Sequence, residues 1–450
     1  MVQSSSLEKN VQYHPAAFNL KVVLRETGLS ADTLRAWERR YGLPKPERTP
    51  GGHRLYSQRD IEMIKWLMAR QAEGLSISRA VELWKEQIAS GRDPLADSAS
   101  SRVSLPPSPR LETLRHNWIA ACSHYDTISA EQILNEAFAV HSVELICTDV
   151  LLRGLYEIGE LWHKGLISVH QEHFASEIAM RRVEALIAAA PPPVRSGAIL
   201  TACPAGEQHV FPLALLTLFL RRRGWNVIHL GANVPTERLE ETIRLVQPKL
   251  VILSAQTLVT AVSLRAMARL LQARGIPAAF GGRVFNTINL LYQRIPAYFL
   301  GNTLEISLPR IENLIAQAIP TPLEQPIPRK ILDLANEYKR NQPLIEAALR
   351  QEFDAQGQAI EYLDTAISFL KEALSAALDL GDLDYISADI DWLIALLSQH
   401  RVSVSYLPVF LQRYSQATQK IMGDTGRPIC DWLNLQAQKL ATTLAEIKPL

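Results

Sequence analysis

Residues 197–212 read GAILTACPAGEQHVFP, an apolar run that ends in a loop carrying Glu207 and His209. Four more short apolar runs follow, separated by helical patterns: WNVIHLG (225–231), KLVILSA (249–255), IPAAFGG (276–282) and AYFLG (297–301). Short buried strands that alternate with helices are typical of a doubly wound parallel sheet. We therefore predict an α/β domain over residues 196–318.

The loop after the first run is a candidate ligand site. Ligands of such sheets bind beyond the carboxyl ends of the strands, where Glu207 and His209 fall. A neutral imidazole is a good metal ligand, and a carboxylate two residues earlier can accept its other N–H and fix the tautomer. Taken alone the pair is weak evidence, because an unliganded loop histidine explains it more simply.

Length and composition set outer limits. At 450 residues the chain is too long for one core, so we expect several domains. Hydrophobic residues make up 47% and charged residues 21% of the chain, and the formal net charge is +1. These values are ordinary for a globular protein, so any nucleic-acid site must be a local basic patch.

Breaks in composition divide the chain. The Ser- and Pro-rich stretch over residues 91–110 has little to bury and is predicted to be a linker. Apolar residues at helical spacing predict a helical bundle over residues 111–190. The connector PTPLEQPIPR (320–329) then leads into an all-α C-terminal domain over residues 330–450.

Cysteine use and hydropathy favour the cytoplasm. The four cysteines have neither zinc-site spacing nor the density of a secreted disulfide scaffold. The opening MVQSSSLEKN lacks the apolar core of a secretion signal, and no apolar stretch approaches the length of a membrane span. We expect a cytoplasmic protein with no membrane partner.

The first module, residues 17–90, has the pattern of a winged helix-turn-helix. A helix, a turn at residues 27–29 and a second helix are followed by the glycine turn of RTPGGHRLYS (48–57). Between residues 17 and 70 there are 11 Lys and Arg against 6 Asp and Glu, and three arginines share the second helix. Such a basic surface attracts phosphates, although a solvated basic face is the simpler alternative.

The segment LRAWERRYGLPKPERTPGGHRLYS (34–57) closely resembles the DNA-binding domain of MerR-family regulators, over about 70 residues. The resemblance implies dimers on double-stranded DNA with a palindromic operator, and Trp37 and Tyr41 holding the recognition helix and wing together. No cysteine precedes Cys122, so heavy-metal sensing is not expected. The expected DNA-contacting residues are Arg35, Arg39, Arg40, Arg48, His53, Arg54 and Tyr56.

Residues 196 to about 315 resemble the vitamin B12-binding domain, which has a Rossmann-like fold. Its Asp-x-His-x-x-Gly pattern appears as Glu207, His209 and Pro212, and after 41 intervening residues Ser254 begins the next motif. The resemblance implies that His209 replaces the cofactor's own base on cobalt. Pro212 in place of glycine puts the packing of the nucleotide tail in doubt. The other residues expected beside the cofactor are Ser254, Gln256, Thr257, Gly281 and Gly282.

The bundle contains LWHKGLISVHQEHFAS (161–176), in which Trp162 is followed by nine residues and then Glu172-His173. This pattern resembles the Trp-x9-Glu-His motif of CarH-type photoreceptors. It implies that Trp162 covers the 5′-deoxyadenosyl group, that Glu172 and His173 border the upper face, and that His163 binds cobalt after the group is lost. Packed and solvated residues are the plain alternative.

The C-terminal domain extends beyond the usual CarH-type chain. Its aromatic residues indicate core packing or oligomerisation, and a bilin such as biliverdin bound here is the less favoured alternative. They are Trp392, Tyr406, Phe410, Tyr414 and Trp432, with His400 nearby.

Together these patterns predict a light-responsive transcriptional regulator, not an enzyme, with adenosylcobalamin as chromophore. Photolysis of the Co–C bond would change the assembly of a homo-oligomer, dimer or tetramer, and its DNA binding. Two alternatives stay open: a corrinoid carrier or B12 enzyme component, and a cobalamin-sensing regulator that does not respond to light.

Overall fold

The computed structural model describes residues 18–27, 29, 31–48, 52, 54–72, 77–89, 109–317, 319–355, 363–387 and 406–446. The chain divides into two compact units, residues 1–108 and 109–450. We describe each unit by itself.

The first unit is a small helical module with a three-stranded antiparallel sheet. The strand order is β1-β3-β2, and Arg48 of β2 lies opposite Arg54 of β3. Trp37 is buried in its core, and the rings of Trp66 and Trp84 meet edge to face at 5.3 Å. Its elements are β1 (Phe18–Asn19), α1 (Leu20–Thr27), α2 (Ala31–Tyr41), β2 (Glu47–Arg48), β3 (Arg54–Tyr56), α3 (Gln58–Ala72) and α4 (Ile77–Ala89).

The second unit begins with a helical bundle. Ser168 opens helix α10 with a capping box, because its side chain and that of Gln171 each bond the other's backbone N–H. Gly154 lets α9 approach Trp118, since a Cβ there would lie 2.9 Å from the indole ring. The elements are α6 (Pro109–Ser123), α7 (Thr127–Val140), α8 (Val143–Ile146), the π-helical turn η1 (Cys147–Leu152), α9 (Arg153–His163) and α10 (Val169–Ala188).

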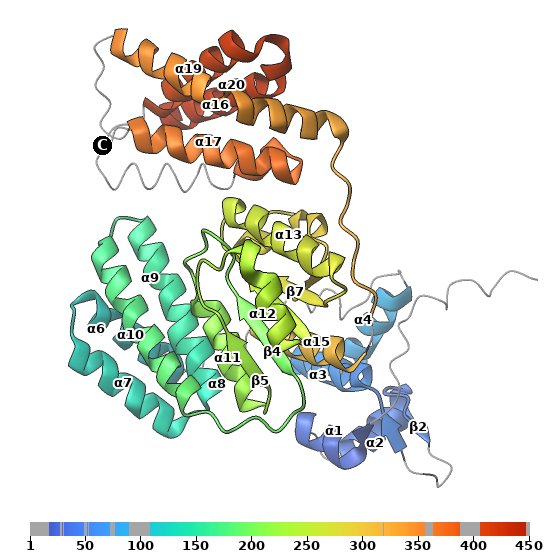
Figure 1. Ribbon diagram of the computed structural model, residues 1–450. Helices are drawn as coiled ribbons and strands as arrows, with labels where there is room; N and C mark the ends of the chain where they lie inside the picture. The colour runs from blue at the N-terminus through green and yellow to red at the C-terminus, as the bar shows by residue number, and fades with distance from the viewer. Residues whose placement is uncertain are drawn as a thin grey trace, which may run out of the picture. The chain divides into compact units, whose positions relative to one another are not determined.

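A five-stranded parallel sheet follows, with helices on both faces (Figure 1). Its strand order is β5-β4-β6-β7-β8, which confirms the predicted doubly wound α/β fold. The strands are β4 (Ala198–Ala202), β5 (Asn226–His229), β6 (Leu250–Ser254), β7 (Ala278–Gly281) and β8 (Tyr298–Phe299). The helices are α11 (Phe211–Arg222), η2 (Thr236–Arg238), α12 (Leu239–Val246), α13 (Leu258–Ala273), α14 (Arg283–Thr287), η3 (Leu291–Arg294) and α15 (Leu304–Ala316).

The two faces of the sheet bury different partners. Successive side chains of a strand point to opposite faces, so Ile199 joins the core shared with α11 and the bundle, whereas Leu200 joins the core under α13. The core under α13 continues into the C-terminal helices, and α13 packs against α17. The sheet is therefore covered by helices from before it and after it in sequence.

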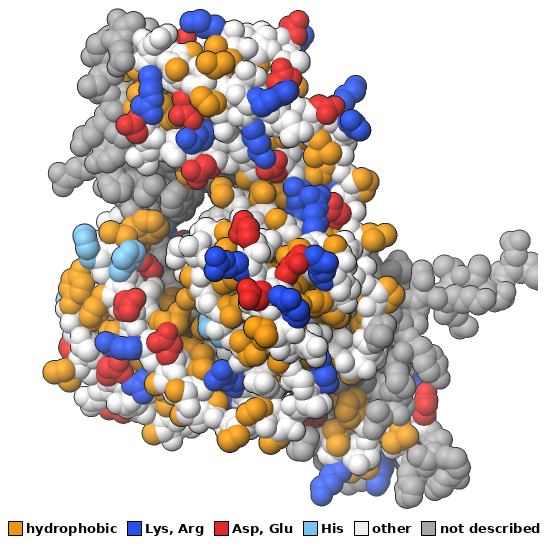
Figure 2. All heavy atoms as spheres, in the orientation of Figure 1, with side chains coloured by type: hydrophobic (Ala, Val, Ile, Leu, Met, Phe, Trp, Pro, Cys, Tyr) orange, Lys and Arg blue, Asp and Glu red, His pale blue; other side chains and the backbone are white. Residues whose placement is uncertain are grey.

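The C-terminal part is all helical, as predicted. Its elements are α16 (Arg329–Ala355), α17 (Leu363–Leu380), η4 (Leu383–Ile386), α19 (Tyr406–Met422), η5 (Gly423–Gly426) and α20 (Arg427–Glu446). Figure 2 shows Lys and Arg interspersed with Asp and Glu on the visible face of the α/β part, in keeping with the net charge of +1. None of the helices in the described part of the chain combines the length and hydropathy needed to cross a bilayer.

Candidate functional site

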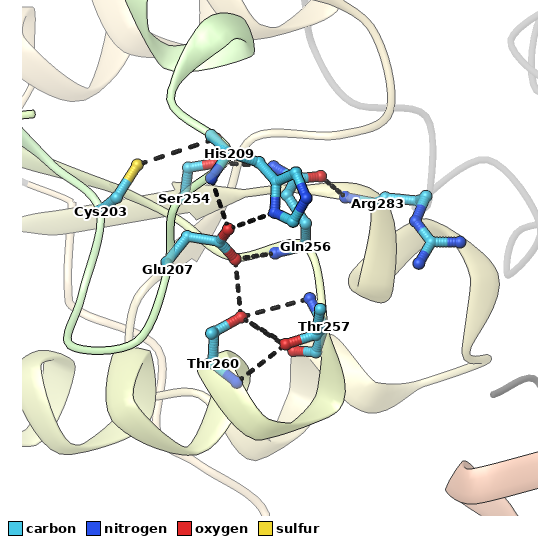
Figure 3. A network of polar contacts seen from close by, with 8 residues as sticks. All are labelled: Cys203, Glu207, His209, Ser254, Gln256, Thr257, Thr260 and Arg283. Atoms are coloured by element: carbon cyan, nitrogen blue, oxygen red, sulfur yellow. Dashed lines mark hydrogen bonds and ion pairs between the residues drawn. The ribbon is translucent and has the colours of Figure 1, made fainter. Parts of the chain in front are cut away.

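The two loops that carry the B12-like motif meet at one point of the sheet. The chain leaves β4 toward β5 on one side, and β6 pairs with β4 on the other, so the strand order reverses there. Crevices at such switch points bind ligands in open α/β sheets. Glu207 and His209 follow β4, and Gln256 follows β6; Figure 3 shows their side chains converging.

Glu207 is the centre of the polar network. Its side chain is 1% exposed, and its carboxylate accepts bonds from both loops and from α13. Oε1 accepts from the backbone N–H of His209 at 2.8 Å, whereas Oε2 accepts from Gln256 N at 2.6 Å and Thr260 Oγ1 at 2.7 Å. Burial opposes ionisation, but the hydrogen bonds outweigh it and hold the pKa of Glu207 below its usual value. Glu207 is therefore an ionised carboxylate at neutral pH.

His209 presents its other nitrogen outward. Its Nδ1 lies 2.7 Å from Glu207 Oε1, and because an ionised carboxylate only accepts, Nδ1 carries the hydrogen. Nε2 then keeps a lone pair on a side chain that is 68% exposed. The bond to Glu207 raises the pKa of His209, burial lowers it, and Glu172 and Arg283 act in opposite directions through their charges. This is the tautomer that a metal ligand requires.

Gln256 joins the ends of three strands. Its Nε2 donates to Ser254 Oγ at 3.0 Å, and its Oε1 accepts from the backbone N–H of Arg283 at 2.8 Å. Thr257 caps α13, and its Oγ1 accepts from Thr260 N at 3.2 Å. The expected residues Ser254, Gln256 and Thr257 thus belong to the same network as Glu207.

The two glycines at the end of β7, Gly281 and Gly282, have different surroundings. Gly282 has φ +131°, and a Cβ there would lie 1.8 Å from the carbonyl oxygen of Ala255. Gly281 has no atom within 4 Å of its Cβ position. Gly282 is therefore needed by the fold, whereas Gly281 leaves open space.

Pro212 fits the helix that follows the site. It lies in the first turn of α11, where its missing N–H has no partner to lose. The replacement of the usual glycine therefore leaves the start of α11 intact.

The cysteines are buried thiols. All four are free, and burial raises the pKa of Cys203, the cysteine nearest the loop, to about 12. Cys203 Sγ faces the backbone oxygen of His209 at 4.0 Å. A neutral thiol is a poor metal ligand, so Cys203 does not compete with His209.

The expected upper-face residues lie on the bundle. Trp162 and His163 end α9, and Glu172 and His173 lie in the first turns of α10. His173 Nδ1 lies 2.6 Å from Glu172 Oε2. The charge of Glu172 contributes to the raised pKa of His209. His163 and His173 make no hydrogen bond to the described residues of that loop.

The N-terminal unit displays the expected arginines on its second helix. Arg35, Arg39 and Arg40 are exposed on α2, and the last two lie in its final turn. Trp37 is buried, and the Tyr41 hydroxyl lies 3.2 Å from Ser78 Oγ on α4. The side chain of Arg48, and His53 altogether, lie outside the described residues.

One expected DNA contact in the wing, which comprises strands β2 and β3, is wrong. Tyr56 is fully buried, and its hydroxyl donates to Glu38 Oε1 at 2.5 Å. Burial and this bond raise the pKa of Tyr56. Tyr56 is therefore a core residue in this structure, not an exposed residue available to a phosphate. Arg54 is half-buried, with its Nε 2.9 Å from Glu38 Oε2.

Sequence reasoning missed Thr260 and Glu38. Thr260 is 4% exposed and bonds Glu207 from α13; the Thr-x-x-Thr spacing of a capping box could have indicated it. Glu38 joins α2 to the wing, and no spacing rule points to that contact. Asn233 was missed too: its backbone N–H donates to Glu207 O at 3.0 Å.

The C-terminal aromatics pack mostly inside. Phe410, Tyr414 and Trp432 are buried, Tyr406 is exposed, and Trp392 and His400 lie outside the described residues. The Tyr414 hydroxyl lies 2.7 Å from that of Tyr338. A groove of about 650 Å³ between α19 and α20 is lined by charged residues of both signs, Lys420 and Arg427 with Asp424 and Asp431. Core packing accounts for the buried aromatics.

The residues at the switch point fit a corrinoid. The corrin ring would hold most of the cobalt's coordination sites, and a protein nitrogen could take the place of the cofactor's own base. The exposed Nε2 of His209, with the ionised Glu207 behind its other nitrogen, is such a donor. The open space at Gly281 leaves room for a ligand to approach the sheet.

Comparison with known families matches three parts of the chain. Residues 18–87 match the MerR HTH family regulatory protein model. Residues 114–187 and 197–301 each match a B12 binding domain model. The helix-turn-helix and both halves of the cobalamin module are thus identified.

Two curated relatives are similar to more than half of this chain. The HTH-type transcriptional repressor CarH of Myxococcus xanthus is 32% identical over 284 residues, 62% of this chain and 94% of its own length. The repressor CarA of the same organism is 33% identical over 52% of this chain and 75% of its own. A solved structure, the monomethylamine corrinoid protein of Methanosarcina barkeri, is 18% identical over 45% of this chain and 99% of its own; its TM-score of 0.40 supports no functional conclusion.

The domain matches and the extent of the similarity to CarH agree with the residues at the switch point. Both relatives are named as transcriptional repressors, not enzymes, and this chain matches the MerR HTH and B12 binding domain models. The chain belongs to the CarH-type, B12-binding regulators of the MerR family.

Proposed function

We propose that this regulator responds to light through adenosylcobalamin and that illumination changes its oligomeric state and its hold on a palindromic operator. The observation that carries the proposal is the ionised Glu207 bonded to Nδ1 of His209, which leaves Nε2 available at the switch point. Bound adenosylcobalamin would supply a cobalt–carbon bond that light breaks.

The chain's own residues divide the work. Glu207 orients His209, and His209 would be the nitrogen ligand of the cobalt. Trp162 would shield the organic ligand and exclude water, with Glu172 and His173 beside it. His163 would supply a second nitrogen ligand in the illuminated state.

Each domain of the chain has a role in this proposal. Residues 17–90 would form the head, 111–190 the bundle over the cofactor and 196–318 its binding domain. Of the expected linker, residues 91–110, only Pro109 and Arg110 lie among the described residues, and they begin α6. Residues 330–450, which share a core with the sheet, would serve assembly of the homo-oligomer. Binding of biliverdin there stays a prediction, which adding biliverdin to the apoprotein in the dark tests by absorption.

The test uses the full chain loaded with adenosylcobalamin in the dark. Absorption, size-exclusion chromatography and binding to an operator duplex are recorded before and after green light. We expect loss of the alkyl-cobalt bands together with a change in size and affinity. Loss of those bands with unchanged size and affinity would leave a cobalamin-sensing regulator without a light response.

A further inference from the structure

Glu38 lies on α2, the second helix of the DNA-binding head, and its side chain is largely buried. It belongs to α2, between the exposed Arg35 and Arg39, and its side chain is only 11% exposed. Both carboxylate oxygens are used: Oε2 accepts from Arg54 Nε at 2.9 Å, and Oε1 accepts from the Tyr56 hydroxyl at 2.5 Å. A single carboxylate thus joins the second helix to strand β3 of the wing.

Arg54 contacts Glu38 through a single guanidinium nitrogen, Nε. A guanidinium has five N–H donors in a plane, and Glu38 accepts from Nε. The two terminal nitrogens lie beyond this bond, and the Arg54 side chain is 34% exposed. Charge-assisted bonds of this kind fix orientation as well as adding energy. Among the described residues Arg54 is therefore held in one orientation through Nε alone.

We infer that Glu38 is a positioning residue for DNA binding: it sets the wing against the recognition helix and aims Arg54 at a backbone phosphate without touching DNA itself. The inference rests on the proposed DNA site of the head. Tyr56, buried with its hydroxyl on the same carboxylate, serves the same purpose from inside the core.

A positioning role for Glu38 and a merely repulsive one predict opposite changes in DNA affinity when its charge is removed. A carboxylate near a DNA-binding face repels phosphates, so neutralising an acidic residue that does nothing else tightens binding. Removing a positioning residue weakens binding to a specific site instead. Glu38→Gln keeps the size of the side chain and removes the charge, so the two roles predict opposite changes.

The experiment uses the full chain with adenosylcobalamin in the dark and two duplexes of equal length, measured by fluorescence anisotropy over a range of salt. One duplex is selected from a random library by the wild-type protein, and the other is unrelated. For E38Q we expect about tenfold weaker binding to the selected duplex. Binding to the unrelated duplex should be unchanged or slightly tighter, because the head has lost a negative charge.

Glu47→Gln is the matched control, because Glu47 is an exposed acidic residue of β2 in the same head. It should bind both duplexes as tightly as wild type or slightly tighter. If E38Q behaves like E47Q on the selected duplex, Glu38 has no positioning role. If the wild type selects no duplex, the proposed DNA site fails instead.

Loss of binding to both duplexes would reveal that E38Q has lost its fold. In that case Tyr56→Phe tests the positioning role of Glu38. This variant keeps the ring and the ion pair but removes one donor to Glu38. It should weaken the selected complex about threefold and leave the unrelated one unchanged. Wild-type affinity of Y56F for both duplexes would then overturn the inference.

Discussion

His209 Nδ1 lies 2.7 Å from Oε1 of Glu207, while the other oxygen of that carboxylate accepts from the backbone of Gln256 after the neighbouring strand. One buried charge therefore orients the imidazole and ties together the two loops on either side of the switch point. Most of the predictions below concern this pair.

Replacing His209 should change how cobalamin is bound. H209A lacks the only imidazole in this loop, so the cofactor should keep its own base on cobalt or fail to bind. Absorption and electron paramagnetic resonance of the reduced complex report the nitrogen ligand. His124→Ala, at an exposed histidine of the bundle, should leave the spectra unchanged. Wild-type spectra from H209A would remove His209 from the cobalt.

Weakening Glu207 should cost both affinity and stability. In E207Q a neutral amide replaces an acceptor that serves Gln256, Thr260 and His209, so about 1–3 kcal/mol of unfolding free energy is lost. Cobalamin affinity should fall roughly 10- to 100-fold, as for other residues that orient metal ligands. Thr260→Val removes one donor and should show a smaller loss of each. Calorimetry and thermal melts would contradict this if E207Q matched wild type.

Cobalamin binding through His209 should weaken in acid. The bond to Glu207 raises the pKa of His209, and below that pKa the protonated ring has no lone pair on Nε2. Affinity should therefore be constant above the pKa and fall about tenfold per pH unit below it. In E207Q the midpoint should move to lower pH, because the charge that favours the protonated ring is gone. A titration of Kd against pH measures both, and identical midpoints would contradict this account.

His163 should matter only after illumination. H163A keeps every contact of the His209 loop, so dark loading and dark assembly should equal wild type. The lit product should lose its upper nitrogen ligand and give a different, less durable spectrum. Size-exclusion chromatography in the dark and absorption after green light separate the two effects. A wild-type lit spectrum from H163A would show that another group binds there.

The two glycines after β7 should respond oppositely to alanine. Gly282→Ala forces a Cβ to 1.8 Å from Ala255 O, so the apoprotein should lose several degrees of melting temperature or fail to fold. Gly281→Ala meets no atom within 4 Å and should leave the apoprotein stable. If the nucleotide tail passes Gly281 closely, G281A should nevertheless bind cobalamin more weakly. Unchanged affinity of G281A would place the tail elsewhere.

Strand periodicity was enough to predict the sheet and to place His209 at its carboxyl edge, because alternation of short apolar runs with helices has few other solutions. It could not predict the partners of Glu207 on α13, since Thr260 is far from it in sequence and meets it only through the pairing of β4 with β6. The burial of Tyr56 could not be predicted from the sequence either. A tyrosine beside exposed arginines looks like a surface residue until the packing of the wing buries it.

Helix α13 carries a further consequence. Its first turn is bonded to Glu207 through Thr260, and five residues further on Arg265 is buried, where the charges of Glu324 and of Asp379 on α17 act on its pKa. Arg269, one turn further, pairs with Glu324 of the connector at 2.9 Å. Helix α13 therefore links the carboxylate that orients His209 to the connector and to α17, which packs against it. We expect a displacement of the His209 loop to reach the C-terminal helices along this path.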